Sequence, residues 1–385
     1  MKVFILAGEA SGDRLGAALM AGLRHLTNVE FIGVGGPLME TEGLQSLFPM
    51  DELSVMGIIE VLPKYRHLKR RIRETAEAAL GSDADVMITI DSPDFSLRVA
   101  ALVKASSDMR TVHYVAPSVW AWRAGRAAKM AKVIDHVLAL LPFEPPYMEA
   151  AGMACDFVGH PVVSEPQATK AEIEDFRARH VLGDAPVMLV LPGSRRGEVG
   201  RLGPIFGKAL GPVLERHPNL RLVVPTTAHV APVLRDVVVD WPASPLILDP
   251  SQMESDAYKA EKACAFGTAT GALAASGTVS LELAASATPM VIAYDVTWVS
   301  RQIIAMMLKI DTLTLVNLVS ETRAIPECNG KHCNPPEIAA ALIKMLESPG
   351  AQLDAMALTM ERLGRGGEAP GLRAARAILD GIGRG

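Results

Sequence analysis

The chain has 385 residues, of which 49% are hydrophobic and 21% are charged, and its formal net charge at pH 7 is −5. This length allows two domains with separate cores, and the composition is typical of a globular protein and excludes a disordered one. The small net charge argues against bulk binding to nucleic acid.

Neither a leader nor a membrane span is expected. The first apolar run, residues 3–7, is too short for a signal peptide, and acidic residues follow it directly. Four scattered cysteines indicate a reducing compartment rather than a disulfide framework. A zinc site at Cys328, His332 and Cys333 would lack a second ligand pair, so core and loop cysteines are favoured. We therefore expect a cytosolic protein that at most rests on a membrane.

The first half of the chain alternates predicted strands and helices. A strand over 2–7 leads through a glycine-bearing loop into a helix that ends near Leu26, and such first loops bind ligands in α/β domains. Further strands are predicted at 29–34, 85–90, 112–115, 136–141 and 156–158.

The second half repeats this alternation after a polar joint at 159–185. Strands are predicted at 187–191, 220–224, 245–248, 289–294 and 312–316, and helices at 337–347 and after Asp354. The pattern predicts an α/β protein with two doubly wound, Rossmann-like domains that face a central cleft. The expected parts are an N-terminal domain, a C-terminal domain and C-terminal helices that pack back on the N-terminal domain, at 1–165, 166–350 and 351–385.

Residues 272–295 predict a βαβ unit whose first turn lies at the carboxyl edge of a parallel sheet. The apolar run breaks at Ser276 and Gly277, where glycine lets the backbone turn and a ligand approach. Thr278 lies where a new helix offers unpaired N–H groups that favour an anion such as a diphosphate. Glu282, about one turn later, is placed to accept both hydroxyls of a ribose. An ordinary helix start with a solvated glutamate explains the spacing equally well.

Arg195 follows the first strand of the second half and is positioned to neutralise a phosphate, although Arg196 shows that a surface arginine is the alternative. The Asp83-Ala84-Asp85 run matches a metal-binding spacing, but it precedes its strand and so lies at the wrong edge of the sheet. We therefore expect the diphosphate to be held by a helix dipole and an arginine, without a metal ion or cofactor.

Asp91 and Asp94 follow a predicted buried strand, at the edge where catalytic groups of α/β proteins collect. One of them is expected to cap the next helix, and the other to act as a general base on an acceptor hydroxyl. We assign the structural role to Asp91 and the chemical role to Asp94.

A densely basic stretch, KYRHLKRRIR at 64–73, follows an apolar run at 55–62. Its apolar side chains fall on one helical face with cations around them. This combination predicts contact with an anionic membrane surface or a lipid phosphate, and a solvated helix face is the alternative. The expected membrane-facing residues are Ile58, Ile59, Leu62, Lys69, Arg70, Arg71 and Arg73.

Ten ordered motifs carry a resemblance to a known family. They are AGEASGD (7–13), GVGGPLM (33–39), MGIIEVLP (56–63), IDSPDFS (90–96), APSVWAWR (116–123), LPFE (141–144), FVGHP (157–161), LPGSRRGE (191–198), ASGTVSLE (275–282) and VNL with IPE (316–318 and 325–327). Together they resemble the lipid-A-disaccharide synthases, a GT-B glycosyltransferase family, over most of the chain.

The resemblance implies transfer of a diacylated glucosamine from its UDP carrier to a diacylglucosamine 1-phosphate, which gives a β-1,6-linked disaccharide and UDP. It implies a lipid-bearing nucleotide-sugar donor, a lipid monosaccharide phosphate acceptor and work at the cytoplasmic face of the inner membrane, and it is compatible with an oligomer. The residues that match are Asp94 as base, Arg195, Gly277, Thr278, Glu282 and Asn317 around UDP, and Glu9 and Ser11 facing the sugars.

The chain departs from the family pattern at two places. Cys328-Asn329-Gly330 stands where the family usually continues to a glutamine, and Glu321 falls where glycine is common. Other GT-B enzymes, namely a UDP-sugar epimerase or the peptidoglycan N-acetylglucosamine transferase, and a non-catalytic nucleotide-sugar binding protein are the alternatives.

Overall fold

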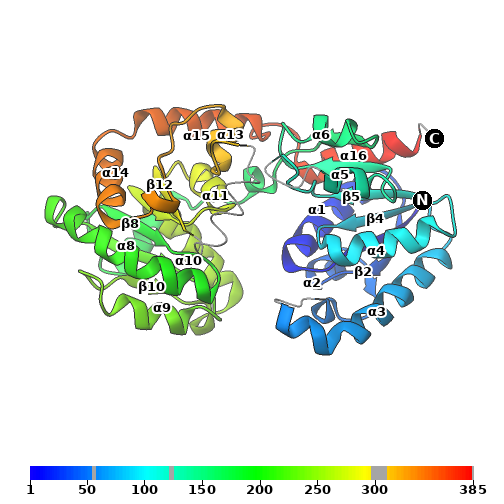
Figure 1. The fold of residues 1–385 in the computed structure, drawn as a ribbon, viewed down its shortest axis with the longest axis horizontal. Helices are drawn as coiled ribbons and strands as arrows, with labels where there is room; N and C mark the ends of the chain where they lie inside the picture. Colours follow the sequence, from blue (N-terminus) through cyan, green and yellow to red (C-terminus); the bar gives the residue numbers. More distant parts are fainter. Residues whose placement is uncertain (54–57, 121–124, 296–309, 384–385) are drawn as a thin grey trace. The chain divides into compact units, whose positions relative to one another are not determined.

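The computed structural model describes residues 1–53, 58–120, 125–295 and 310–383, without the side chains of 58–65. The chain forms two compact units, Met1–Ser164 with Leu363–Gly385, and Glu165–Arg362 (Figure 1). We expected the C-terminal helices at 351–385 to pack back on the N-terminal domain, and only the last of them does so. Helix α15 (Gly350–Arg362) packs with the second unit, whereas α16 (Pro370–Ile382) packs on α1 (Ala10–Leu26) of the first.

The first unit contains a parallel sheet with the order β3-β2-β1-β4-β5-β6-β7 within the described residues. Its strands are β1 (Lys2–Ala7), β2 (Glu30–Val34), β3 (Gln45–Ser46), β4 (Val86–Ile90), β5 (Arg110–Tyr114), β6 (His136–Ala139) and β7 (Ala154–Phe157). Besides α1 and α16, its helices are α2 (Pro37–Thr41), α3 (Ile58–Leu80), α4 (Pro93–Lys104), α5 (Gly125–Met130) and α6 (Pro145–Glu149).

Alternating side chains of β1 enter two separate cores, because successive residues of a strand point to opposite faces of the sheet. Val3, Ile5 and Ala7 pack with buried side chains of α1 and α16. Phe4 and Leu6 pack with α3 and α4 on the other face. Helices on both faces explain why this parallel strand is a continuous apolar run.

The second unit contains a parallel sheet with the order β10-β9-β8-β11-β12-β13 among the described residues. Its strands are β8 (Val187–Leu191), β9 (Arg221–Pro225), β10 (Leu246–Leu248), β11 (Gly271–Ala274), β12 (Met290–Tyr294) and β13 (Glu327–Asn329). Its helices besides α15 are α7 (Lys170–Arg179), α8 (Arg196–Arg216), α9 (Ala231–Val238), α10 (Ser255–Thr268), α11 (Val279–Ala285), α13 (Leu315–Ser320) and α14 (Pro335–Glu347). One core joins α8, α9 and α14 to the sheet.

The strand predicted at 312–316 is wrong. Helix α13 begins at Leu315, and the edge strand of the sheet is instead β13. The carboxylate of Glu327 accepts hydrogen bonds from the backbone N–H groups of Leu313 and Thr314, the latter at 2.9 Å. A carboxylate at a helix start satisfies donors that the helix itself leaves unpaired, so this contact favours a helix over the strand that the alternating pattern suggested.

Both sheets wind outward and then reverse. In the first, the chain passes from β1 to β2 and β3, and β4 then returns to the other side of β1. In the second, β8, β9 and β10 are followed by β11 on the other side of β8. Ligands of open parallel sheets bind at such reversal points, outside the carboxyl ends of the strands. Each unit therefore has one expected ligand position, at the loops after β1 and β4 or after β8 and β11.

Candidate active site

Glu9 and Ser92 bring together the loops after β1 and β4. Glu9 is the residue before α1, and Ser92 precedes α4. A Cβ at Gly8 would lie only 2.7 Å from the Ser92 hydroxyl oxygen, so glycine permits this close approach. Burial and the negative charge of Asp91 raise the pKa of the Glu9 carboxyl, against a hydrogen bond from Ser92. The first reversal point therefore holds two acidic groups close enough for the charge of one to act on the other.

The turn after β4 is strained. Asp91 and Ser92 have φ values of 49° and 44°, in the left-handed region that non-glycine residues rarely adopt. The Asp91 N–H donates to the Tyr114 carbonyl at 3.0 Å, and the Asp91 carbonyl accepts from the Ser96 hydroxyl at 2.8 Å. We expected the Asp91 side chain to cap α4. In this described segment Ser92, not Asp91, is the N-cap residue, and its side chain forms no cap hydrogen bond. Asp91 instead shapes the turn through its backbone.

Asp94 and Ser11 lie in the first turns of α4 and α1, and both are exposed. Their helices start directly after the two loops that meet at the reversal point. The structure therefore places Asp94, Glu9 and Ser11 at one edge of one sheet.

A buried glutamate at the same edge was missed as a functional candidate. Glu144 follows β6 and is 4% exposed, and its carboxylate accepts from the N–H groups of Leu141 and Leu140 at 3.0 and 3.1 Å. The indole of Trp120 lies 3.4 Å away, and its ring meets Phe143 edge-on. Burial outweighs these bonds and raises the pKa of Glu144 to about 7. An acidic residue a few positions after an apolar strand was the signal available in the sequence.

The loop after β8 brings Arg195 to the second reversal point. Gly193 has a φ of 119°, and a Cβ there would lie 2.6 Å from a carboxylate oxygen of Glu198, so the turn needs glycine. Arg195 is the residue before α8, and its Nη1 donates to Glu198 Oε1 at 3.1 Å. The Arg195 side chain is 76% exposed, which leaves most of its guanidinium free to meet an anion.

The loop after β11 carries the predicted turn. Gly277 and Thr278 are exposed, Ser276 is half-buried, and α11 begins at Val279. The pairing of β11 with β8 continues up to the turn, because the Ala275 N–H donates to the carbonyl of Leu191, the last residue of β8, at 2.8 Å. Arg195 and the 276–278 turn therefore follow adjacent strands.

Glu282 lies on α11 and is paired with a residue that the sequence analysis missed. Its carboxylate forms an ion pair with Lys262 of α10. The two side chains are 30% and 36% exposed, respectively. Nothing in the local sequence signals this contact, since α10 precedes β11 and α11 follows it.

Asn317, which the resemblance places around UDP, has a buried side chain in the structure. It is 1% exposed, its amide donates to the Ile325 carbonyl at 2.9 Å, and its oxygen accepts from the Ile325 N–H at 3.0 Å. Asn317 thus holds the 325–327 segment. Glu321, where glycine is common in the family, has a φ of 59° at the end of α13, so the position does require a left-handed residue.

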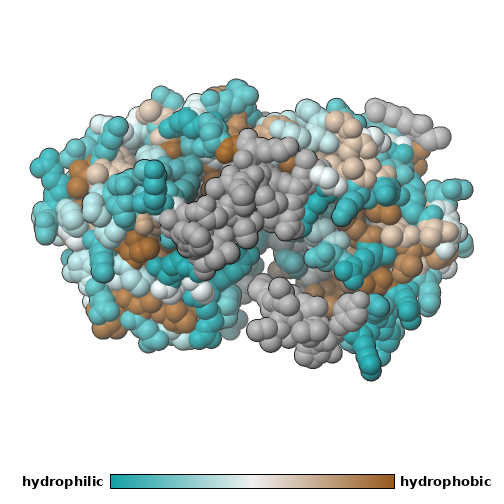
Figure 2. Space-filling model, in the orientation of Figure 1, coloured by the Kyte–Doolittle hydropathy of each residue, from teal (hydrophilic) through white to brown (hydrophobic). Residues whose placement is uncertain are grey.

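Arg71 is not a free membrane-facing cation. Its guanidinium donates to both carboxylate oxygens of Glu52 at 2.7 and 2.8 Å and lies 4.3 Å from the centre of the Phe48 ring. Ile72 packs into the core, so this end of the apolar stripe faces inward. Among the described side chains of α3, four other cations are exposed, namely Arg66, Lys69, Arg70 and Arg73, and Arg70 pairs with Glu74 at 3.4 Å. Hydrophilic residues cover much of the surface where α3 lies (Figure 2). The predicted contacts Ile58, Ile59 and Leu62 lie outside the described side chains.

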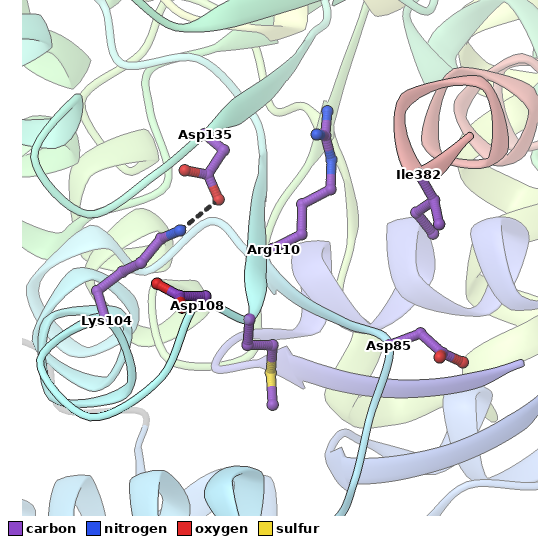
Figure 3. A pocket seen from close by; sticks show the side chains of 7 residues that line it. Asp85, Lys104, Asp108, Arg110, Asp135 and Ile382 are labelled. Carbon is purple, nitrogen blue, oxygen red and sulfur yellow. Dashed lines mark ion pairs between the residues drawn. The ribbon is translucent and has the colours of Figure 1, made fainter. Parts of the chain in front are cut away.

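A hollow of about 420 Å³ lies at the opposite, amino edge of the first sheet (Figure 3). Asp85 and Arg110 line it, and Lys104 and Asp135 pair across it at 2.7 Å. Asp85 accepts from the Lys2 N–H at 2.7 Å, so the rejected Asp83-Ala84-Asp85 run does lie at the amino edge. Within the described residues, the structure contains neither a cluster of metal ligands nor a helix long and apolar enough to span a membrane.

Solved structures of low sequence identity share this fold. A UDP-GlcNAc 2-epimerase from Neisseria meningitidis bound to UDP-GlcNAc superposes with a TM-score of 0.65 at 11% identity, over all of both chains. A glycosyltransferase from Rickettsia africae gives 0.62 at 12% identity and covers 100% of this chain and 98% of that one. The fold is therefore GT-B.

Comparison by sequence is more specific. The family model described as lipid-A-disaccharide synthetase matches residues 3–367. A lipid-A-disaccharide synthase from Ruegeria pomeroyi is 66% identical over 99% of this chain and 95% of the relative. One from Rhodospirillum centenum is 46% identical over 99% and 94%. The chain therefore belongs to the lipid-A-disaccharide synthetase family and is a hexosyltransferase that forms the lipid A disaccharide.

Proposed function

We propose that the enzyme transfers 2,3-diacylglucosamine from UDP to the 6-hydroxyl of 2,3-diacylglucosamine 1-phosphate with inversion, which gives the β-1,6 disaccharide 1-phosphate and UDP. The family match over residues 3–367 carries this proposal. It is supported by the two reversal points, whose loops contain a carboxylate in the first unit and an exposed arginine in the second. One in-line displacement needs only a base and a stabilised leaving group.

The first unit supplies the base. Asp94 takes the proton from the acceptor hydroxyl as its oxygen bonds to the anomeric carbon, and the bonding electrons of the donor leave with UDP. The exposed position of Asp94, after a turn fixed by two strained residues, supports this role. Glu9 and Ser11 face the reacting sugars, and burial and the charge of Asp91 raise the pKa of the Glu9 carboxyl.

The second unit binds UDP. Arg195, which is tethered to Glu198 by a single contact of 3.1 Å, exchanges this partner for the diphosphate. The 276–278 turn offers backbone N–H groups, and Glu282 accepts hydroxyls of the ribose. Asn317 acts indirectly, by holding the segment at 325–327. In this account the leaving diphosphate is stabilised without a metal ion.

The site of action is the membrane surface that holds the acyl chains of both substrates. We propose peripheral binding at the cytoplasmic face of the inner membrane through α3. The exposed cations at Arg66, Lys69, Arg70 and Arg73 support an electrostatic contact, and Ile58, Ile59 and Leu62 are proposed to insert. Arg71 is left out of this surface because Glu52 holds it.

The direct test is incubation of the protein with UDP-2,3-diacylglucosamine and 2,3-diacylglucosamine 1-phosphate, followed by mass spectrometry. Disaccharide 1-phosphate and UDP should form in equal amounts, and only when both substrates are present. An epimerised nucleotide sugar, formed without acceptor, would instead identify an epimerase. Release of UDP without disaccharide would contradict the transfer.

A further inference from the structure

Lys262 lies where it can control Glu282. The ammonium of Lys262 on α10 pairs with Oε2 of Glu282 on α11, across the strand β11 that separates these helices in the chain. Both partners are about one-third exposed. The adjacent lysine of α10, Lys259, pairs instead with Asp256 on its own helix, and these two side chains are 65% and 93% exposed. Of Lys259 and Lys262, it is therefore Lys262 that contacts a residue at the second reversal point.

Neighbouring groups restrict the Lys262 side chain. Tyr258, one turn earlier on the same face of α10, donates from its hydroxyl to the Thr226 carbonyl after β9. Phe266, one turn later, is 4% exposed, and its ring centre lies 5.2 Å from the Lys262 ammonium. Burial and the charge of Glu282 raise the pKa of Tyr258 to about 12, so this hydroxyl stays a neutral donor. The inward face of α10 is thus anchored on both sides of Lys262.

A carboxylate beside a nucleoside diphosphate presents two physical problems. It must face the ribose hydroxyls in a fixed orientation, because an exposed glutamate side chain otherwise samples several rotamers. Its negative charge also repels the diphosphate, and this repulsion is stronger near protein than in bulk water. A cation on one carboxylate oxygen addresses both, because it restricts the side chain and offsets the charge.

We propose that Lys262 is a positioning residue for the donor nucleotide, which acts through Glu282 to present the carboxylate to the ribose. This inference rests on the ribose contact proposed for Glu282. It predicts that the contribution of Lys262 to affinity depends both on the Glu282 carboxylate and on a ribose hydroxyl.

The test is calorimetric titration of the full chain with UDP and with 2′-deoxy-UDP. Lys262→Met should weaken UDP binding about fivefold, a typical coupling for groups in contact, and Lys262→Arg should restore most of the affinity. In a Glu282→Gln background, Lys262→Met should have no further effect. Against 2′-deoxy-UDP, Lys262→Met should change affinity less than it changes affinity for UDP. Lys259→Met is the matched control and should bind both ligands like wild type.

The outcomes separate this inference from the proposed function. If Glu282→Gln binds UDP normally, the ribose role of Glu282 fails, and the inference fails with it. If Glu282→Gln weakens UDP binding while Lys262→Met does not, only the positioning role of Lys262 is refuted. The positioning role is also refuted if Lys262→Met weakens the binding of UDP and of 2′-deoxy-UDP equally, both in wild type and in the Glu282→Gln background. Lys262 would then act on affinity without the Glu282 carboxylate.

Discussion

Replacement of Glu144 by glutamine should make the protein more stable at high pH. Glu144 is 4% exposed in the loop after β6, and burial raises its pKa from 4.5 to about 7. Glutamine keeps the shape and one oxygen to accept from the N–H groups of Leu140 and Leu141, but it does not ionise. The change with pH of the stability difference between wild type and variant therefore isolates the effect of ionising a buried carboxyl.

The sign and size follow from linkage between proton binding and folding. The folded state binds the Glu144 proton more tightly than the unfolded state, so this group stabilises the fold at low pH, and that contribution is lost as pH rises from about 4.5 to about 7. The shift from 4.5 to about 7 corresponds to about 3 kcal/mol at 1.36 kcal/mol per pKa unit. Glutamine carries no such pH-dependent cost.

The measurement is denaturant unfolding of wild type and Glu144→Gln at pH 5 and pH 8, monitored by tryptophan fluorescence. The stability of the variant relative to wild type should rise between these pH values by up to about 3 kcal/mol. Glu149→Gln, on the exposed side of helix α6 that follows Glu144, is the control for the loss of one exposed carboxylate. A Glu144→Gln difference that is the same at both pH values would refute the linkage.

Three further predictions concern the reaction. Asp94→Asn should lower turnover roughly 10²–10⁴-fold with intact folding, and a normal Asp94→Asn enzyme beside an inactive Asp91→Asn enzyme would identify the other carboxylate as the base. Activity should survive EDTA, and a loss that magnesium or manganese restores would contradict an arginine-held leaving group. Binding to anionic vesicles should weaken with salt, by on the order of 1 kcal/mol for each cation involved. Replacing Arg66, Lys69 and Arg73 with Glu should reduce co-sedimentation of the protein with these vesicles and leave its UDP affinity unchanged. If the variant co-sediments like wild type, the cations of α3 form a solvated helix face and not a membrane contact.

Both reversal points were predictable from sequence because their signals are local. Apolar strands followed by glycine and polar residues mark the carboxyl edges of parallel sheets, and β1 and β8 were predicted at their observed bounds. The failure at 312–316 has a physical cause. Alternating Thr and Leu side chains suggested a strand, but the deciding contact comes from Glu327, 13 residues after the Thr314 N–H that it binds.

Tertiary pairs were beyond reach of the sequence for the same reason. Lys262 is 20 residues from Glu282, Glu144 is 24 from Trp120, and Glu52 is 19 from Arg71. In each pair, the separation exceeds one helical turn, and the packing of whole elements decides whether the side chains meet. A charge run thus predicted the exposed cations of α3, but it gave no sign that Arg71 is held by Glu52.

The loops at the two reversal points use different residue types in left-handed conformations. After β8, a glycine supplies the left-handed turn, and the loop that carries Arg195 stays open to an anion. After β4, Asp91 and Ser92 adopt left-handed conformations, at a cost of about 1–3 kcal/mol each that glycine would avoid. Glycine there would widen the conformations open to the loop that positions Asp94. A phosphate contact tolerates a loose backbone, whereas a base must hold its angle to one hydroxyl, so the strain after β4 is consistent with the proposed role of Asp94 as base.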